Sequence, residues 1–181
     1  MRELSLHILD LVENAIRAGA TKIEVMVEEQ PEADHLAIAV EDNGPGLPVD
    51  AEKAADPFYT TKEGKKTGLG LSLFRFRVEQ AGGRMTIERS ALGGLAVRAG
   101  MQLDHVDRSP LGDLASTIAS VVCTNPGVEI RACLRVAGRE LAVNSTEIAR
   151  GIPFGSRSEI AVARAMRRRI TEGLEALHAA E

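Results

Sequence analysis

Three side chains near the N-terminus are spaced so that one face of a helix would present them together. Asp10, Asn14 and Arg17 stand at positions i, i+4 and i+7, which share a face of an α-helix. A carboxylate can accept a proton from water, an amide oxygen can ligate Mg²⁺ and a guanidinium can bind phosphate. The same spacing is also typical of a solvated polar stripe, so the triplet alone leaves both interpretations open.

A second group of residues, EDNGPGL at 41–47, follows a stretch that alternates like a β-strand. Asp42 could accept a hydrogen bond from an exocyclic amine, and Gly44 and Gly46 would let the backbone approach a flat ligand closely. Asp-Asn-Gly strings are also common in ordinary turns, so this segment is weak support by itself.

The third group combines lysines with a glycine-rich helix start in the segment KKTGLGL at 65–71. Backbone N–H groups at a helix N-terminus attract anions, and the lysines add positive charge. The GxxxxGK[ST] pattern of a Walker loop does not occur. The residues concerned are Lys62, Lys65, Lys66, Thr67, Gly68, Leu69 and Gly70.

The elements that must position these groups follow from the hydrophobic periodicity. An apolar stripe predicts a helix over 3–18 ending at Gly19, and alternation predicts strands over 21–29 and 35–43. A helix over 69–82 and two strands over 84–90 and 93–103 follow the polar stretch 50–67. This order lacks regular βαβ alternation, so it predicts an α+β fold with helices packed on a mixed, mostly antiparallel sheet.

The segment beyond DHVDRSP at 104–110 is predicted to form a small α-β-β-α extension. It comprises a helix over 111–123, a hairpin over 128–145 turning at Ala137-Gly138, and a last helix. Ser156 and Glu159 have the spacing of a capping box at the start of that helix. The chain is therefore divided into 1–103 and 104–181, and the second part is a candidate for partner docking or dimerisation.

The last helix is expected to have one apolar and one basic side. A run of arginines is more typical of a solvated face than of a membrane or acidic-partner site. The apolar stripe consists of Ile160, Ala163, Met166, Ile170, Leu174 and Leu177, and the basic side of Arg164, Arg167, Arg168 and Arg169.

Composition narrows the class of protein. The 181 residues include 22 basic and 26 acidic side chains, and a net charge of −4 argues against a dedicated nucleic-acid binder. Apolar stretches are too short for a membrane span, and Glu3 and Asp10 interrupt any signal peptide, so a cytoplasmic protein is expected. Cys123 and Cys133 fit neither a disulfide framework nor a zinc site.

As an ordered set, these motifs resemble the GHKL superfamily, the ATP-binding fold of gyrase, the heat-shock chaperone, histidine kinases and MutL. LDLVENAIRAGATKIEV (9–25) is similar to the N-box of MutL, and EDNGPGL to the glycine box that follows it. DPFYTTK (56–62) resembles the F-box of histidine kinases, and KKTGLGLSL (65–73) their second glycine box. The resemblance covers roughly 3–103 and implies a two-layer α/β sandwich of the Bergerat type that binds ATP and Mg²⁺.

The resemblance also implies a role for each motif residue. Asn14 is similar to the Mg²⁺ ligand, and Asp42 to the carboxylate that recognises the adenine amine. The turn whose amides hold the phosphates is matched by Gly68, Leu69 and Gly70. The other matches are Gly44 and Gly46 beside the base, Arg17 as a phosphate-facing cation, Phe58 as a lid anchor, and Lys62, Lys66 and Thr67 in or beside the mobile lid.

Two departures from the superfamily pattern bear on catalysis. Hydrolysing members carry a Glu four residues before the metal-binding Asn, and here that position is Asp10, one methylene shorter. Asp10 as the catalytic base is therefore a hypothesis, because a misplaced base costs rate. The segment GGLAV (93–97) has no Ser or Thr after the glycine, so it lacks the hydroxyl that helps to fix adenine through water.

The leading interpretation is an ATP-dependent regulator of an unidentified protein partner, with slow ATP hydrolysis. The alternatives are phosphotransfer to a partner in trans, as in the anti-sigma serine kinases, and a non-catalytic nucleotide-sensing subunit of a redox enzyme system. Only 13 residues precede Asn14 and no acidic-Pro pattern follows His7, so no phosphoacceptor domain is expected and His7 is predicted to be packed or hydrogen-bonded. A homodimer is expected only because relatives often dimerise.

Overall fold

The computed structural model describes residues 3–46 and 69–179. The helices are α1 Leu4–Arg17, α3 Leu69–Gln80, α4 Leu114–Thr124, α5 Ser145–Gly151 and α6 Glu159–His178, with short 3₁₀ turns η1 Pro31–Ala33 and η2 Phe154–Ser156. The strands are β1 Lys22–Gln30, β2 His35–Asp42, β3 Arg84–Arg89, β4 Leu95–Gln102, β5 Glu129–Val136 and β6 Arg139–Asn144.

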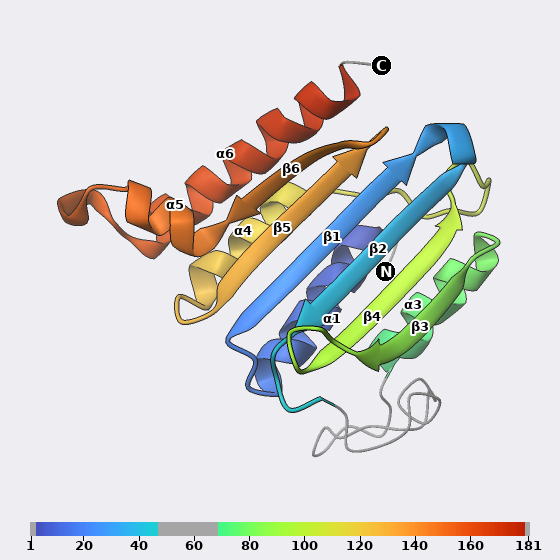
Figure 1. Ribbon diagram of the computed structural model, residues 1–181, viewed down its shortest axis with the longest axis horizontal. Helices are drawn as coiled ribbons and strands as arrows, with labels where there is room; N and C mark the ends of the chain where they lie inside the picture. Colours follow the sequence, from blue (N-terminus) through green and yellow to red (C-terminus); the bar gives the residue numbers. More distant parts are fainter. Residues whose placement is uncertain (1–2, 47–68, 180–181) are drawn as a thin grey trace.

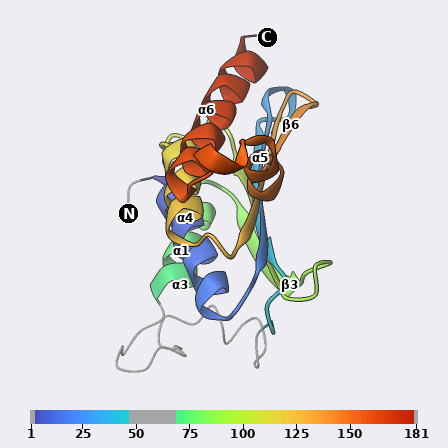
Figure 2. The same ribbon diagram turned by 90° about the vertical axis from the view of Figure 1, so that its left-hand side faces the viewer.

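The six described strands form one sheet in the order β3-β4-β2-β1-β5-β6 (Figure 1). Every neighbouring pair among them is antiparallel except β1 and β5, which run parallel. The helices α1, α3, α4 and α6 lie on one face of this sheet (Figure 2). The predicted α+β class, with two layers and a mixed, mostly antiparallel sheet, is therefore confirmed.

The helix α1 forms because its apolar residues recur on one face, and that face packs into the core. Leu4, Ile8 and Val12 are almost fully buried, against strand residues such as Ile23 and Val25 of the same core. The helix ends at Arg17, and Gly19 follows with a φ of +92°. Glycine adopts this left-handed backbone without strain, so the predicted stop at Gly19 is confirmed.

The C-terminal extension shares the sheet and the core of the preceding residues. Strand β5 pairs with β1 along its length, with Val25 opposite Ala132. The hairpin turn at Ala137-Gly138 is confirmed, because both residues have positive φ. Helix α5 was not anticipated; it begins where the Asn144 side chain accepts hydrogen bonds from the backbone N–H groups of Thr146 and Glu147.

Two details of the predicted last helix are wrong. Helix α6 begins at Glu159 and is capped by Ser158, whose hydroxyl accepts from the backbone N–H of Ala161; Ser156 lies in the preceding 3₁₀ turn η2. Ile160 is 61% exposed, because the first turn of α6 extends beyond the sheet. The remainder of the stripe is buried or partly buried against the core: Ala163, Met166, Ile170, Leu174 and Leu177.

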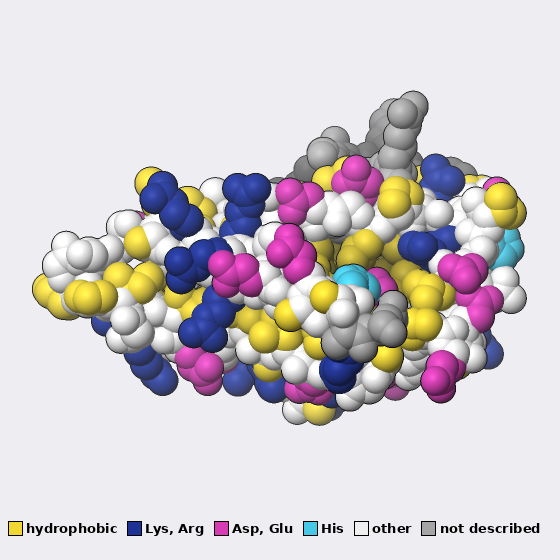
Figure 3. All heavy atoms as spheres, turned by 90° about the horizontal axis from the view of Figure 1, so that it is seen from above, with side chains coloured by type: hydrophobic (Ala, Val, Ile, Leu, Met, Phe, Trp, Pro, Cys, Tyr) yellow, Lys and Arg dark blue, Asp and Glu magenta, His cyan; other side chains and the backbone are white. Residues whose placement is uncertain are grey.

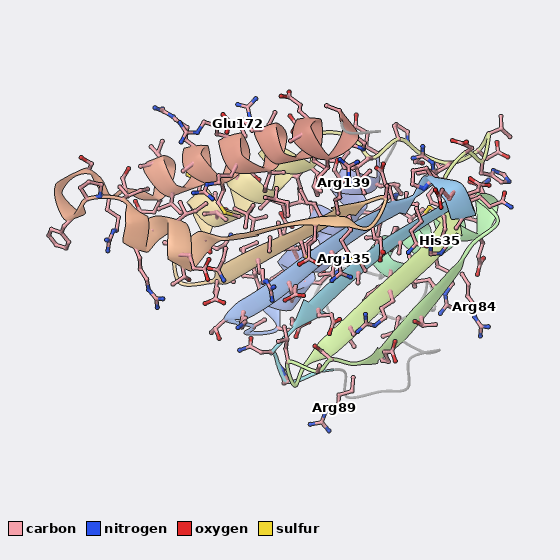
Figure 4. All side chains as sticks on the ribbon, turned by 45° about the horizontal axis from the view of Figure 1, so that its top comes forward. His35, Arg84, Arg89, Arg135, Arg139 and Glu172 are labelled. Atoms are coloured by element: carbon pink, nitrogen blue, oxygen red, sulfur yellow. The ribbon has the colours of Figure 1, made fainter. Side chains whose placement is uncertain are left out.

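Charged side chains pair across strands on the sheet face that lies away from α1, α3, α4 and α6 (Figure 4). Arg131 pairs with Glu24 at 3.1 Å, and Arg135 pairs with Glu140 at 2.6 Å. In Figure 3 the basic side chains gather toward the end of the molecule that carries α5 and the start of α6. Within the described residues, no helix is long and apolar enough to cross a membrane.

Candidate functional site

The first contact of the site joins α1 to the start of α3. A Cβ built on Gly70 would overlap Asp10 Oδ2 and would lie 3.1 Å from Asp10 Cγ and 3.9 Å from Asn14 Nδ2. Two motifs nearly sixty positions apart in the sequence therefore touch through a residue that has no side chain. This close approach requires glycine, because any other residue would push the carboxylate aside.

Arg17 is bound to its own helix and to Asn14. Its Nη2 donates to Asn14 Oδ1 at 2.7 Å, and its Nε donates to the backbone carbonyl of Glu13 at 3.1 Å. The oxygen predicted to ligate Mg²⁺ thus already has a cation beside it. The structure therefore brings Asp10, Asn14 and Arg17 onto one face, and Glu13 is exposed to solvent.

Asp42 ends β2 and is the one buried acidic residue among the described residues, with 7% of its surface exposed. Its Oδ1 accepts from the backbone N–H of Gly44 at 2.7 Å and from that of Leu95 at 3.3 Å. Both bonds fix the orientation of the carboxylate. Among the described residues both go to Oδ1, so Oδ2 is the oxygen that the amine of a ligand could reach.

Gly94 lies beside Asp42 at the end of β2, although the motifs assigned it no role. Its N–H donates to the Asp42 carbonyl at 3.0 Å. A Cβ on Gly94 would overlap Asp42 Oδ1 and would lie 2.6 Å from the Gly44 nitrogen. The Gly93-Gly94 pair was the available signal, and the close approach of Gly94 explains why the residue after Gly93 carries no side chain.

The loop after β2 is hydrogen-bonded to the turn between α1 and β1. The side-chain oxygen of Asn43 accepts from the backbone N–H groups of Thr21 and Lys22, at 2.9 Å and 2.8 Å. A Cβ built on Gly44 would lie 3.6 Å from the Cβ of Ala20, in the turn between α1 and β1, and Gly46 has a φ of +76°. The end of α1, the end of β2 and the start of α3 therefore lie at the same end of the molecule (Figure 1).

Several predicted site residues cannot be placed. Phe58, Lys62, Lys66, Thr67 and Gly68 lie outside the described residues. Leu69 begins α3, but its side chain is also outside the description.

His7 lies one turn along α1 from Asp10, in the same seam between α1 and α3. Its ring stacks on Phe74 of α3 with centroids 5.4 Å apart, and neither ring nitrogen has a hydrogen-bond partner among the described residues. The pKa of His7 is lowered from 6.5 to about 4, mainly by burial and then by the positive charges of the N-terminal amine and Arg77, while Asp10 acts in the opposite direction. The prediction of a packed His7 is confirmed, and hydrogen bonding is not observed.

The donor set suits Mg²⁺ held jointly with a phosphate ligand. Within the described ranges no group of three or more His, Cys, Asp and Glu side chains could hold a metal ion. Mg²⁺ typically takes one or two protein oxygens and completes its octahedron with phosphate and water. Asn14, with Asp10 beside it, offers that kind of partial site.

Comparison with known proteins assigns the family. Residues 2–105 match the family described as histidine kinase-, DNA gyrase B- and HSP90-like ATPase. The chain belongs to this family. It therefore carries an ATP-binding domain of the histidine kinase type, as the motifs predicted.

The relatives of this ATP-binding domain include much longer proteins. The chain is 47% identical over 72 residues to the sensor kinase CckA of Brucella abortus, covering 39% of this chain and 7% of the relative. It is 40% identical over 92 residues to the sensor histidine kinase CpxA of Escherichia coli, covering 48% of this chain and 20% of the relative. A solved catalytic domain of the histidine kinase ThkA is 31% identical, covers 57% of this chain and 68% of that one, and superposes with a TM-score of 0.46.

Proposed function

We propose that this chain binds Mg·ATP between α1, the end of β2 and the start of α3, and uses it to regulate a partner protein. The observation that supports this most is the meeting of Gly70 with Asp10 and Asn14. It places the N-terminal turn of α3, a favourable location for an anion, beside the amide suited to Mg²⁺.

Each described side chain has a role in this proposal. Asp42 accepts a hydrogen bond from the adenine amine, held in place by the N–H groups of Gly44 and Leu95. Asn14 ligates Mg²⁺, which neutralises charge on the phosphates when it is bound. Arg17 then moves its guanidinium from the Asn14 oxygen toward the phosphates. Phosphoryl chemistry asks mainly for this positioning and charge neutralisation.

Slow hydrolysis in this proposal uses Asp10 as the base that takes a proton from water. Asp10 lies against Gly70, next to the place where the phosphates are expected. Its side chain is one methylene shorter than glutamate, which lengthens the reach to a water and slows the step. Asp10→Asn should spare nucleotide binding and remove hydrolysis, and equal turnover in this variant would refute the role.

Incubation with γ-labelled ATP, alone and with purified candidate partner proteins, separates the proposed activities. Release of free phosphate supports the slow ATPase, and label on a protein supports phosphotransfer. Tight binding with neither product supports a switch that only binds the nucleotide. Absence of binding would refute the whole proposal.

Phosphotransfer in trans is the second candidate. The observation that favours it is that the matched relatives are sensor kinases, among them CckA and CpxA. Labelling of a partner that requires Asn14 but not Asp10 would select this candidate over hydrolysis.

A further inference from the structure

The seam between α1 and α3 contains an imidazole that has no hydrogen-bond partner in the described part of the chain. His7 is 1% exposed, and both of its ring nitrogens lack hydrogen bonds to residues 3–46 and 69–179. A buried polar group without a partner costs on the order of 1–3 kcal/mol, whereas an apolar ring of the same shape would avoid that cost. The stacking on Phe74 could equally be made by a phenylalanine, so packing alone gives no reason for histidine at this position.

The carboxylate of the candidate site is a neighbour of His7 on α1 and acts on its pKa. Asp10 stands three positions after His7 on α1, and residues at this spacing are neighbours on a helix surface. The two helices run in opposite directions along this seam: Gly70 at the start of α3 lies against Asp10, and Phe74 one turn later stacks on His7. Asp10 is thus between the imidazole and the place where the phosphates are expected.

Asp10 and a phosphate group cannot share the start of α3. The carboxylate lies so close to Gly70 that even a methyl group there would overlap it. A carboxylate and a phosphate that both lay against the start of α3 would repel each other in this partly buried site. Nucleotide binding therefore requires the Asp10 side chain to turn away from the N-terminus of α3.

We propose that His7 is a positioning residue, which takes the Asp10 carboxylate as its hydrogen-bond partner when a nucleotide phosphate displaces that carboxylate from α3. This inference rests on the proposed nucleotide site. In the complex His7 takes up one proton from solvent, and the resulting imidazolium donates to the carboxylate. One of the two ring nitrogens thereby gains a partner, and Asp10 is held in one orientation beside the phosphates.

The charges around His7 make this proton uptake conditional on the nucleotide. Without ligand, burial and the positive charges of Arg77 on α3 and of the N-terminal amine keep the imidazole neutral, with a pKa of about 4. Asp10 on α1 acts in the opposite direction and raises that pKa. A direct Asp10 contact and a nearby triphosphate both add negative charge, so the pKa of His7 rises in the complex.

The test follows the His7 ring by ¹⁵N NMR, with and without the non-hydrolysable nucleotide Mg·AMP-PNP. The chain has four histidines, and the signal missing from His7→Phe assigns the ring. We expect the pKa of His7 to rise by about 2.5 units on nucleotide binding, and to rise much less in Asp10→Asn. A value that stays near 4 in a formed complex would overturn the proposal.

Calorimetry gives a second readout that a purely structural role would not change. If nucleotide binding raises the pKa of His7 from about 4 to about 6.5, the protonation of His7 increases the affinity for Mg·AMP-PNP at pH 5.5 by about tenfold. A variant without this imidazole does not gain that increase. The ratio of the wild-type affinity for Mg·AMP-PNP to that of His7→Phe should therefore rise about tenfold when the pH is lowered from 7.5 to 5.5. At pH 5.5 wild type should also take up close to one more proton on binding than His7→Phe. Equal proton uptake in both proteins contradicts the role of His7, and absence of any binding heat in wild type refutes the nucleotide site itself.

Discussion

Gly70 illustrates at the residue scale how the candidate site depends on missing side chains. Gly70 leaves room for Asp10, and Gly94 leaves room for Asp42. Each glycine allows a carboxylate to lie directly against a backbone that would otherwise carry a Cβ atom. The two carboxylates of the site are thus placed by glycines from other elements.

Gly70→Ala should weaken binding of Mg·ATP by at least about tenfold while leaving the fold intact. The new methyl group would displace the flexible end of Asp10 and occupy the start of α3, and alanine is a good helix former. The measurement is calorimetric affinity together with thermal unfolding. Gly127→Ala is the control, since a Cβ there meets nothing within 4 Å; equal affinity in both variants would contradict the site.

Acid should destabilise the protein through His7. The folded-state pKa of His7 is lowered from 6.5 to about 4. Above pH 6.5 the ring is neutral in both the folded and the unfolded chain, so this pKa difference does not affect stability there. As the pH falls from 6.5 to 4, His7 takes up a proton in the unfolded chain but stays neutral in the folded chain. This difference lowers the free energy of unfolding by about 3 kcal/mol. Urea unfolding of wild type and His7→Phe at pH 7.5 and 4.5 measures this difference, and parallel pH dependence of the two proteins would disprove it.

At the scale of elements, the linker between β4 and α4 caps α1. The backbone N–H groups of Leu4 and Ser5 donate to the carbonyls of Pro110 and Leu111, at 2.9 Å and 2.8 Å. These are donors at the start of a helix that no side chain caps. The helix that carries Asp10 and Asn14 is thus held at its N-terminus by residues from the second part of the chain.

Gly112→Ala tests this support. Gly112 has a φ of +77°, and a Cβ there would overlap Glu3 Oε2 and lie 2.6 Å from Ser5 Oγ. Gly138 has a φ of +78° with nothing within 4 Å, so Gly138→Ala measures the cost of the backbone conformation alone. We expect Gly112→Ala to lower the free energy of unfolding by about 1–2 kcal/mol more than Gly138→Ala; equal losses would show that the linker contact is unimportant.

Periodicity was sufficient to predict most elements, and spacing the shared helical face of the candidate site, but neither could predict contacts between distant segments. The face shared by Asp10, Asn14 and Arg17 follows from helix geometry alone. The place of Gly94 against Asp42 depends on the pairing of β2 with β4, which local patterns do not encode. Ser158 rather than Ser156 caps α6 because η2 takes up the residues in between.

At the scale of the whole molecule, one sheet and one core extend across the predicted boundary between 1–103 and 104–181. Strand β1 is hydrogen-bonded to β2 on one side and to β5 on the other, and β5 lies beyond the division. The core is likewise continuous, since Ile23 and Ile130 belong to one buried cluster. Removing the second part would therefore expose both a strand edge and a large apolar surface.

A chain ending at residue 103 should consequently fail to fold on its own, although it contains every predicted ATP-site residue. We expect it to lack a cooperative thermal transition and to aggregate, in contrast to the full chain. Calorimetric unfolding of both chains provides the comparison. A cooperative transition and intact nucleotide binding in residues 1–103 would show that the ATP module is independent of the extension.

The most direct test of the account is the calorimetric affinity of ATP for wild type and Asn14→Ala, with and without Mg²⁺. Asn14 lies beside Gly70 at the start of α3, and its amide oxygen is the proposed metal ligand. The account predicts Mg²⁺-dependent binding in wild type that Asn14→Ala abolishes, while the variant unfolds like wild type. Unchanged Mg²⁺-dependent affinity in Asn14→Ala would contradict the account.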